Sequence, residues 1–277
     1  MDGTSSSRTP SSSRTPSSSR AGSPGGSGSS PAQTGDVRSA DPSAPGEAPG
    51  ELDGGRRRGG VEVVKPLLRG WLHLGMFPLV LAAGVVGVSL APTTGSRWAM
   101  AVFGLTAAML FGVSALYHRG SWSPRARVLL KRFDHSNIFL IIAGTYTPFA
   151  VLLLEPGPQR ALLLVAWLSA LVGVAFRIVW VGAPRWLYVP AYLAMGWVAV
   201  AFLPQFLAGG GPAVLVLIAV GGLLYTLGAV VYGLKRPDPS PRYFGFHEIF
   251  HAFTVLAFVC HYVAVSLALH DGQVPGV

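Results

Sequence analysis

"FHEIFHAFTVLAFVCHYVAVSLAL", residues 246–269, combines two signals in one stretch. Its second part, from residue 252 onward, is apolar and contains no Pro or Gly that would break a helix. A membrane-spanning helix needs about 20 predominantly apolar residues, so the stretch predicts one. Its first residues include HEIFH, which fits the H-E-x-x-H pattern of zinc proteases. The stretch therefore predicts a membrane span that carries a candidate metal site at one end.

Further apolar segments of the same length precede this one. The chain is 51% hydrophobic and only 12% charged, whereas roughly a quarter of the residues of a soluble domain are charged. The breaks between the segments contain Pro, Gly and charged residues. We therefore expect an all-α membrane protein with seven transmembrane helices in a domain of residues 65–270, and the expected spans are about 71–91, 98–117, 134–154, 161–181, 187–207, 212–234 and 246–269.

Residues 1–60 have a different composition. Ser, Gly, Pro and Arg recur there in near-repeats, with almost no large apolar side chains. Such a segment buries too little surface to offset its chain entropy, so we expect a disordered tail. The tail has no apolar core of the kind found in secretory signal peptides.

The basic residues predict the orientation in the membrane. Most of the 21 Lys and Arg lie before the first span, or in and beside the loops that follow the second, fourth and sixth spans. Only Arg97 and Arg160 lie on the other side. The positive-inside rule then places the N-terminus in the cytoplasm and the C-terminus outside. The net charge of +9 is explained by a cytoplasmic face that lies against anionic lipid. We therefore expect membrane lipids rather than nucleic acid as partners. We also expect a multi-pass protein of the plasma membrane.

Ionisable residues within the spans are costly, and they are candidate functional residues for that reason. The predicted topology brings several of them to one depth, near the cytoplasmic face, although they lie far apart in the chain. These residues are His73, His118, Asp134, His135, His247 and His251.

Spacing selects a candidate site among these residues. His247 and His251 are four residues apart, so they share one face of a helix and can bind one Zn²⁺. Catalytic zinc takes three protein ligands and leaves one position open, and His118 completes a set of three histidines. Ser114 precedes His118 by one helical turn, and Asp134 is placed to hold a metal-bound water or to orient a ligand.

A protease site contained within HEIFH is the alternative reading. It needs a third ligand further along the chain, with Glu248 as general base. However, His261 lies ten residues up the same helix, about 15 Å from His251. The third ligand is therefore expected from another helix, and Glu248 is as well explained by its place at a helix start, where a carboxylate suits the dipole.

Three stretches of the chain resemble one known family. "FGVSALYH" (111–118), "RFDHSNIFLIIAGTYTPF" (132–149) and "FGFHEIFH" (244–251) are similar to the hemolysin III family of bacterial membrane proteins. That family is related to the progestin and adipoQ receptors, which include the adiponectin receptors. The resemblance implies seven helices with an inside N-terminus. It also implies a zinc site with His118, His247 and His251 as ligands, and Ser114 and Asp134 beside the metal.

Several functions are compatible with such a site. The first is a zinc-dependent hydrolase of a membrane lipid amide or ester, because the related receptors are associated with ceramidase-like activity. The second is a non-enzymatic lysis factor, or a sensor of membrane state, that zinc stabilises. The third is an intramembrane zinc protease. We expect His73 and His135 to be packing or interfacial residues and His261 to be a core histidine.

Overall fold

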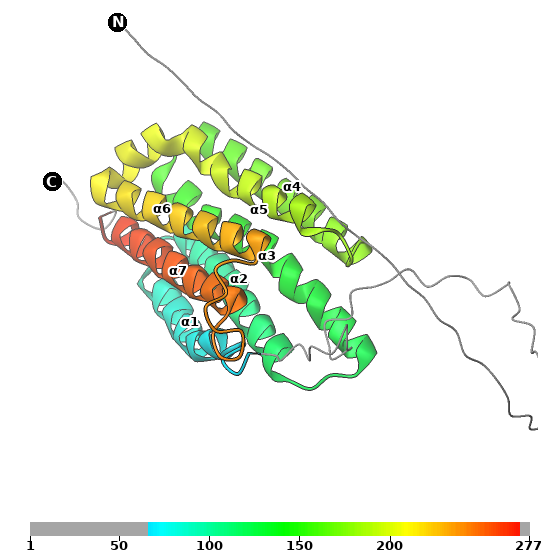
Figure 1. Cartoon of the computed structure of the whole chain (residues 1–277). Helices are drawn as coiled ribbons and strands as arrows, with labels where there is room; N and C mark the ends of the chain where they lie inside the picture. The colour runs from blue at the N-terminus through cyan, green and yellow to red at the C-terminus, as the bar shows by residue number, and fades with distance from the viewer. Residues whose placement is uncertain (1–65, 272–277) are drawn as a thin grey trace, which may run out of the picture. The chain divides into compact units, whose positions relative to one another are not determined.

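The structure, a computed structural model, describes residues 66–271, and these residues form helices with no strand among them (Figure 1). The tail predicted for residues 1–60 lies outside the described residues. The helices are α1 (Trp71–Leu90), α2 (Thr94–Arg119), α3 (Pro124–Leu153), α4 (Pro156–Val179), α5 (Arg185–Trp197), the 3-10 helix η1 (Val198–Phe202), α6 (Leu203–Leu234) and α7 (Phe246–Asp271).

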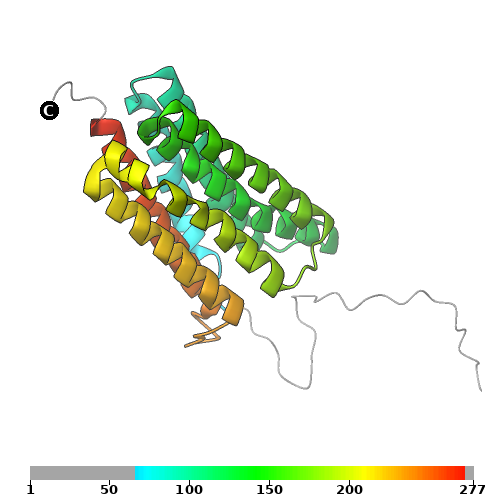
Figure 2. The same ribbon diagram turned by 90° about the horizontal axis from the view of Figure 1, so that it is seen from above.

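Six segments within the described residues are long and apolar enough to cross a membrane. One of them is the continuous stretch Arg185–Leu234, which contains both of the spans predicted at 187–207 and 212–234. The ribbon folds back on itself within this stretch (Figures 1 and 2), and Gly211 has a non-helical backbone there, with φ 70° and ψ 180°. The all-α membrane fold is confirmed, while the seventh span and the orientation of the termini stay predictions.

Helix α3 begins earlier than the sequence indicated. The predicted span started at residue 134, but the helix starts at Pro124. The Ser123 side chain caps it by accepting a hydrogen bond from the Ala126 amide, and Pro124 stands in the first turn, where its missing N–H is not needed. The basic segment that we assigned to a loop is therefore helical, and Asp134 lies well inside α3.

Helix α3 occupies the centre of the bundle. It contacts α2, α4, α5, α6 and α7, and it is the most buried of the candidate spans. The buried side chain of Asn137 on α3 donates a hydrogen bond to the Met109 carbonyl of α2 over 2.9 Å. Helix α7 lies between α1 and α6 and also touches α3 (Figure 1). The starts of α1 and α7 and the end of α2 consequently meet at one end of the bundle.

The segment before α1 is held at this end of the bundle. The Leu67 amide donates a hydrogen bond to the Arg242 carbonyl, in the loop that precedes α7, over 3.0 Å. Gly70 then turns the chain into α1 with φ 82°, a conformation that suits glycine. A Cβ at Gly70 would stand 2.8 Å from the Cβ of His118. The turn therefore packs directly against the end of α2.

The close packing of α2 on α3 generates a stability prediction. A Cβ at Gly144 of α3 would lie 2.8 Å from the Cβ of Thr106 on α2. Because overpacking typically costs about 1–3 kcal/mol, we expect Gly144→Ala to lower the free energy of unfolding by that amount in detergent micelles. Gly75→Ala is the matched control, since no atom lies within 4 Å of the added Cβ. Equal thermal stability of the two variants would contradict this account of the helix contact.

Candidate metal centre

Three histidines from two helices converge at the end of the bundle where α2 ends and α7 begins. One ring nitrogen from each of His118, His247 and His251 lies within 4.8 Å of the others. His118 and His251 are buried, and His247 is half-buried. The Nε2 atoms of His118 and His247 are 3.2 Å apart. The helical repeat of α7 places two of these rings on one face, and the packing of α2 on that face supplies the third.

The spacing of these nitrogens fits a metal ion. Zinc binds imidazole nitrogen at 2.0–2.1 Å in tetrahedral geometry, so two of its ligand atoms lie about 3.4 Å apart. The separation between His118 and His247 matches this value closely. The histidine cluster therefore has the donors and the spacing to hold a metal ion.

Asp134 and Ser114 adjoin the cluster, as the sequence predicted. Oδ2 of Asp134 lies 3.9 Å from Nε2 of His118, and the Ser114 side chain lies beside Asp134. Both residues line the same cavity as His247 and His251. The structure thus brings together all five residues that the sequence selected.

His135 contacts Asp134 in addition to packing inside the bundle. Its Nδ1 lies 2.9 Å from the Lys131 carbonyl, which can only accept, so Nδ1 carries the proton. The same Nδ1 is 3.4 Å from Oδ2 of Asp134. Its Nε2 is 3.4 Å from the Tyr232 hydroxyl, which donates to it. His135 therefore lies in contact with Asp134. The sequence signal for this contact is that His135 directly follows Asp134.

His73 packs against the cluster. Its ring stacks on that of His251, with centroids 3.8 Å apart and planes 7° from parallel. The side chain is buried, and neither ring nitrogen has a hydrogen-bond partner among residues 66–271. His73 is therefore a packing residue, as expected. It packs on the ring of His251, which is a candidate metal ligand.

The contacts of Glu248 do not fit the role of general base that the H-E-x-x-H pattern assigns to it. Its Oε1 accepts from Nε of Arg69 over 3.2 Å, and its Oε2 accepts from the Gly245 amide over 2.9 Å. The side chain is only 1% exposed and does not line the cavity. Glu248 therefore joins the segment before α1 to the start of α7, and the geometry gives no support to its use as a general base.

A buried arginine adds positive charge behind this site. Arg177 of α4 is 1% exposed, and its guanidinium lies 4.5 Å from the centre of the Tyr188 ring. Its charge acts on both Asp134 and His135.

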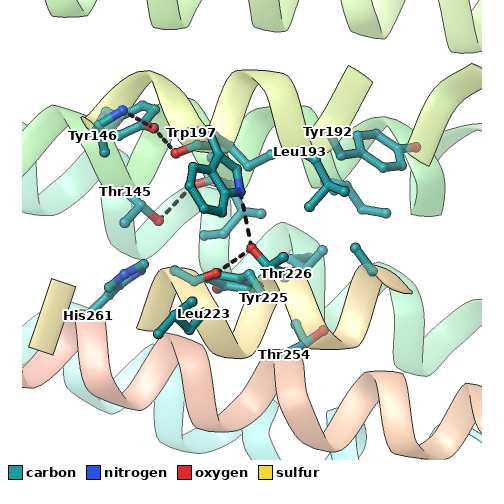
Figure 3. Close-up of a pocket in the computed structure, with 18 of the residues that line it drawn as sticks. Thr145, Tyr146, Tyr192, Leu193, Trp197, Leu223, Tyr225, Thr226, Thr254 and His261 are labelled. Atoms are coloured by element: carbon teal, nitrogen blue, oxygen red, sulfur yellow. Dashed lines mark hydrogen bonds between the residues drawn. The ribbon is translucent and has the colours of Figure 1, made fainter. Parts of the chain in front are cut away.

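An apolar cavity of about 340 Å³ extends from the histidine cluster into the bundle. It runs between α3, α5, α6 and α7 as far as His261, and Figure 3 shows residues of its wall. Three of the lining side chains, Trp197, Val200 and Leu223, are each at least half exposed on the outside of the bundle. The cavity therefore reaches the surface that faces lipid.

These features define a class of protein: a multi-pass helical membrane protein with a buried candidate metal centre at one end of an apolar cavity. Sequence comparison then gives the family. The model of the family described as Haemolysin-III related matches residues 61–262, and the chain belongs to this family.

Individual relatives agree with this assignment. The chain is 32% identical over 180 residues to the Hemolysin-3 homolog of Bacillus subtilis (strain 168), covering 64% of this chain and 81% of the relative. It is 33% identical over 174 residues to Hemolysin-3 of Bacillus cereus, covering 62% and 75%. It is also 30% identical over 190 residues to the Heptahelical transmembrane protein ADIPOR2 of Oryza sativa subsp. japonica, covering 63% and 83%.

Loss of one ligand should release the metal. We expect His118→Ala to lower the metal content of purified protein by at least tenfold, because two imidazoles from one helix bind a metal ion far more weakly than three. Elemental analysis of protein purified without added metal is the measurement. His261→Gln is the control, since it alters a buried histidine outside the cluster. Full metal retention in His118→Ala would remove His118 from the ligand set.

The ion pair of Glu248 gives a prediction with a different readout. We expect Glu248→Gln to lower the free energy of unfolding by about 1–3 kcal/mol, since it leaves Arg69 without its charged partner. The metal content should stay unchanged, because Glu248 is not a member of the histidine cluster. Loss of metal with unchanged stability would instead indicate that Glu248 is part of the metal site.

Proposed function

We propose that this protein is a zinc-dependent hydrolase that cleaves an amide or ester bond of a membrane lipid. The observation that carries the proposal is the position of Asp134. This carboxylate lies beside the candidate ligand His118 and beside Ser114, and it lines an apolar cavity that reaches the lipid-facing surface.

The donor set favours zinc as the metal. Three imidazole nitrogens in a closely spaced group are typical of catalytic zinc sites, whereas calcium and magnesium prefer oxygen ligands. The cluster offers only nitrogen from its three members. When bound, zinc would supply Lewis acidity, which polarises a carbonyl oxygen and makes water a stronger acid.

Side chains of the protein would accept and return the proton of the attacking water. Asp134 would accept a proton from the attacking water as the new carbon–oxygen bond forms. It would then return the proton to the leaving nitrogen or oxygen as the scissile bond breaks, so that the carboxylate is regenerated. Ser114 and His135, which both lie beside Asp134, would keep the carboxylate in position for both transfers.

The cavity supports a lipid as the substrate. Its volume of about 340 Å³ lies in the range of small-molecule sites, and its lining is predominantly apolar. A lipid that enters beside Trp197 and Leu223 would place its acyl chain in the cavity and its head group near Asp134. We further propose that the protein acts in the plasma membrane, where both substrate and product would remain in the bilayer.

Turnover should depend on Asp134. We expect Asp134→Asn to lower hydrolysis of ceramide or of a phospholipid in mixed micelles by at least about a hundredfold, because an amide cannot accept the proton. Its zinc content should stay at the wild-type level. Glu155→Gln, which changes an exposed acid at the other end of α3 and α4, should retain full activity. Wild-type turnover by Asp134→Asn, or no turnover of any tested lipid by the wild type, would remove the hydrolase proposal.

A lytic function is the second candidate, because the Bacillus cereus relative carries the name Hemolysin-3. The same variant separates the two functions. Release of dye from vesicles by wild-type protein and equally by Asp134→Asn would favour a non-enzymatic lysis factor that zinc stabilises. Release that requires Asp134 would instead follow from lipid hydrolysis.

A further inference from the structure

The cavity has a second polar region at the end away from the histidine cluster. Tyr225 of α6 and His261 of α7 both line it, with ring centroids 5.6 Å apart (Figure 3). His261 lies ten residues beyond His251 on the same helix, which corresponds to about 15 Å along the axis. The two polar regions are thus separated by a length of predominantly apolar wall.

Two polar atoms in this region lack partners. The Tyr225 hydroxyl and Nδ1 of His261 are both buried, and neither has a hydrogen-bond partner among the described residues. The His261 side chain is only 8% exposed. Buried polar groups in proteins are nearly always hydrogen-bonded, so a pair of unsatisfied atoms that faces one cavity indicates a ligand group between them.

The tautomer of His261 determines which hydrogen-bond donors and acceptors the ligand group must have. Its Nε2 lies 3.2 Å from the Ile218 carbonyl, which can only accept, so Nε2 donates. In the neutral imidazole, Nδ1 is then a bare acceptor. The Tyr225 hydroxyl can donate a hydrogen bond or accept one. The pair therefore presents one acceptor and one donor to the cavity.

We propose that Tyr225 and His261 form a subsite for a hydroxyl group part-way along the aliphatic chain of a ligand. Such a hydroxyl donates to Nδ1 of His261 and accepts from Tyr225, so both unpartnered atoms are satisfied at once. A ketone only accepts, and it would leave Nδ1 bare. An unsubstituted chain would satisfy neither atom. The apolar wall between the pair and the histidine cluster suits the methylene groups of the chain.

This inference rests on the proposed function only for the class of ligand, a lipid chain in the cavity. It requires no hydrolysis. Binding alone can therefore test it, and the test uses free fatty acids rather than substrates.

The experiment compares stearate with a series of mono-hydroxystearates that carry the hydroxyl at successive mid-chain carbons. Affinity for the purified full-length protein in detergent micelles is measured by displacement of a fluorescent fatty acid. We expect at least one mid-chain isomer to bind roughly threefold to tenfold more tightly than stearate, as one or two net hydrogen bonds would give.

Two variants assign this preference to the pair. Tyr225→Phe removes only the hydroxyl, and His261→Gln keeps a donor for the Ile218 carbonyl while it removes Nδ1. Each should abolish the preference and leave the affinity for stearate unchanged, which also shows that the variant is folded. If one variant does not fold, the other gives the same test. Tyr262→Phe is the matched control, because its hydroxyl donates to the Ala83 carbonyl and the residue does not line the cavity.

Three results would overturn the subsite. Equal affinity for all isomers and for stearate would mean that buried water alone satisfies the pair. A preference that persists in both variants would place the hydroxyl elsewhere. Binding of no fatty acid would exclude the chain from the cavity. A hydroxyl preference in a protein that hydrolyses no lipid would leave the subsite standing and remove only the proposed hydrolase activity.

Discussion

The contact of 3.2 Å between Nε2 of His118 and Nε2 of His247 joins the end of α2 to the start of α7, and much of the surrounding structure is arranged around it. Polar rings are costly inside a membrane protein unless they pair with one another or with a ligand, so this contact constrains how the two helices pack. The turn at Gly70 has no side chain because it passes against His118. His73 covers the cluster by stacking on its third member.

The acids near this contact have separate tasks. Glu248 is occupied by Arg69 and by a backbone amide, so it stabilises the junction between the first and last helices. Asp134 approaches the cluster from α3 and faces the cavity. Asp134 lines a cavity that can admit a substrate, whereas Glu248 does not line it. The difference in their surroundings, more than the motif, favours Asp134 for the chemistry.

Sequence reasoning recovered the helices that have long apolar runs, because span length depends on composition alone. It placed the basic segment before residue 134 in a loop, and this segment is helical behind a Ser123 cap and Pro124. It selected Ser114, His118 and Asp134 by combining spacing with depth, and these side chains lie near one another in the structure. The position of the His135 ring beside Asp134 depends on the surrounding helices, because two adjacent residues on a helix point in different directions.

The sequence by itself determined that this chain is a helical membrane protein and that His247 and His251 share one face of its last span. Both follow from local properties, namely apolar length and the 3.6-residue repeat. Only the tertiary structure decided that Glu248 pairs with Arg69 and that Tyr225 and His261 face one cavity. These contacts join segments far apart in the chain, and they depend on the rotation of each helix about its axis, which packing sets.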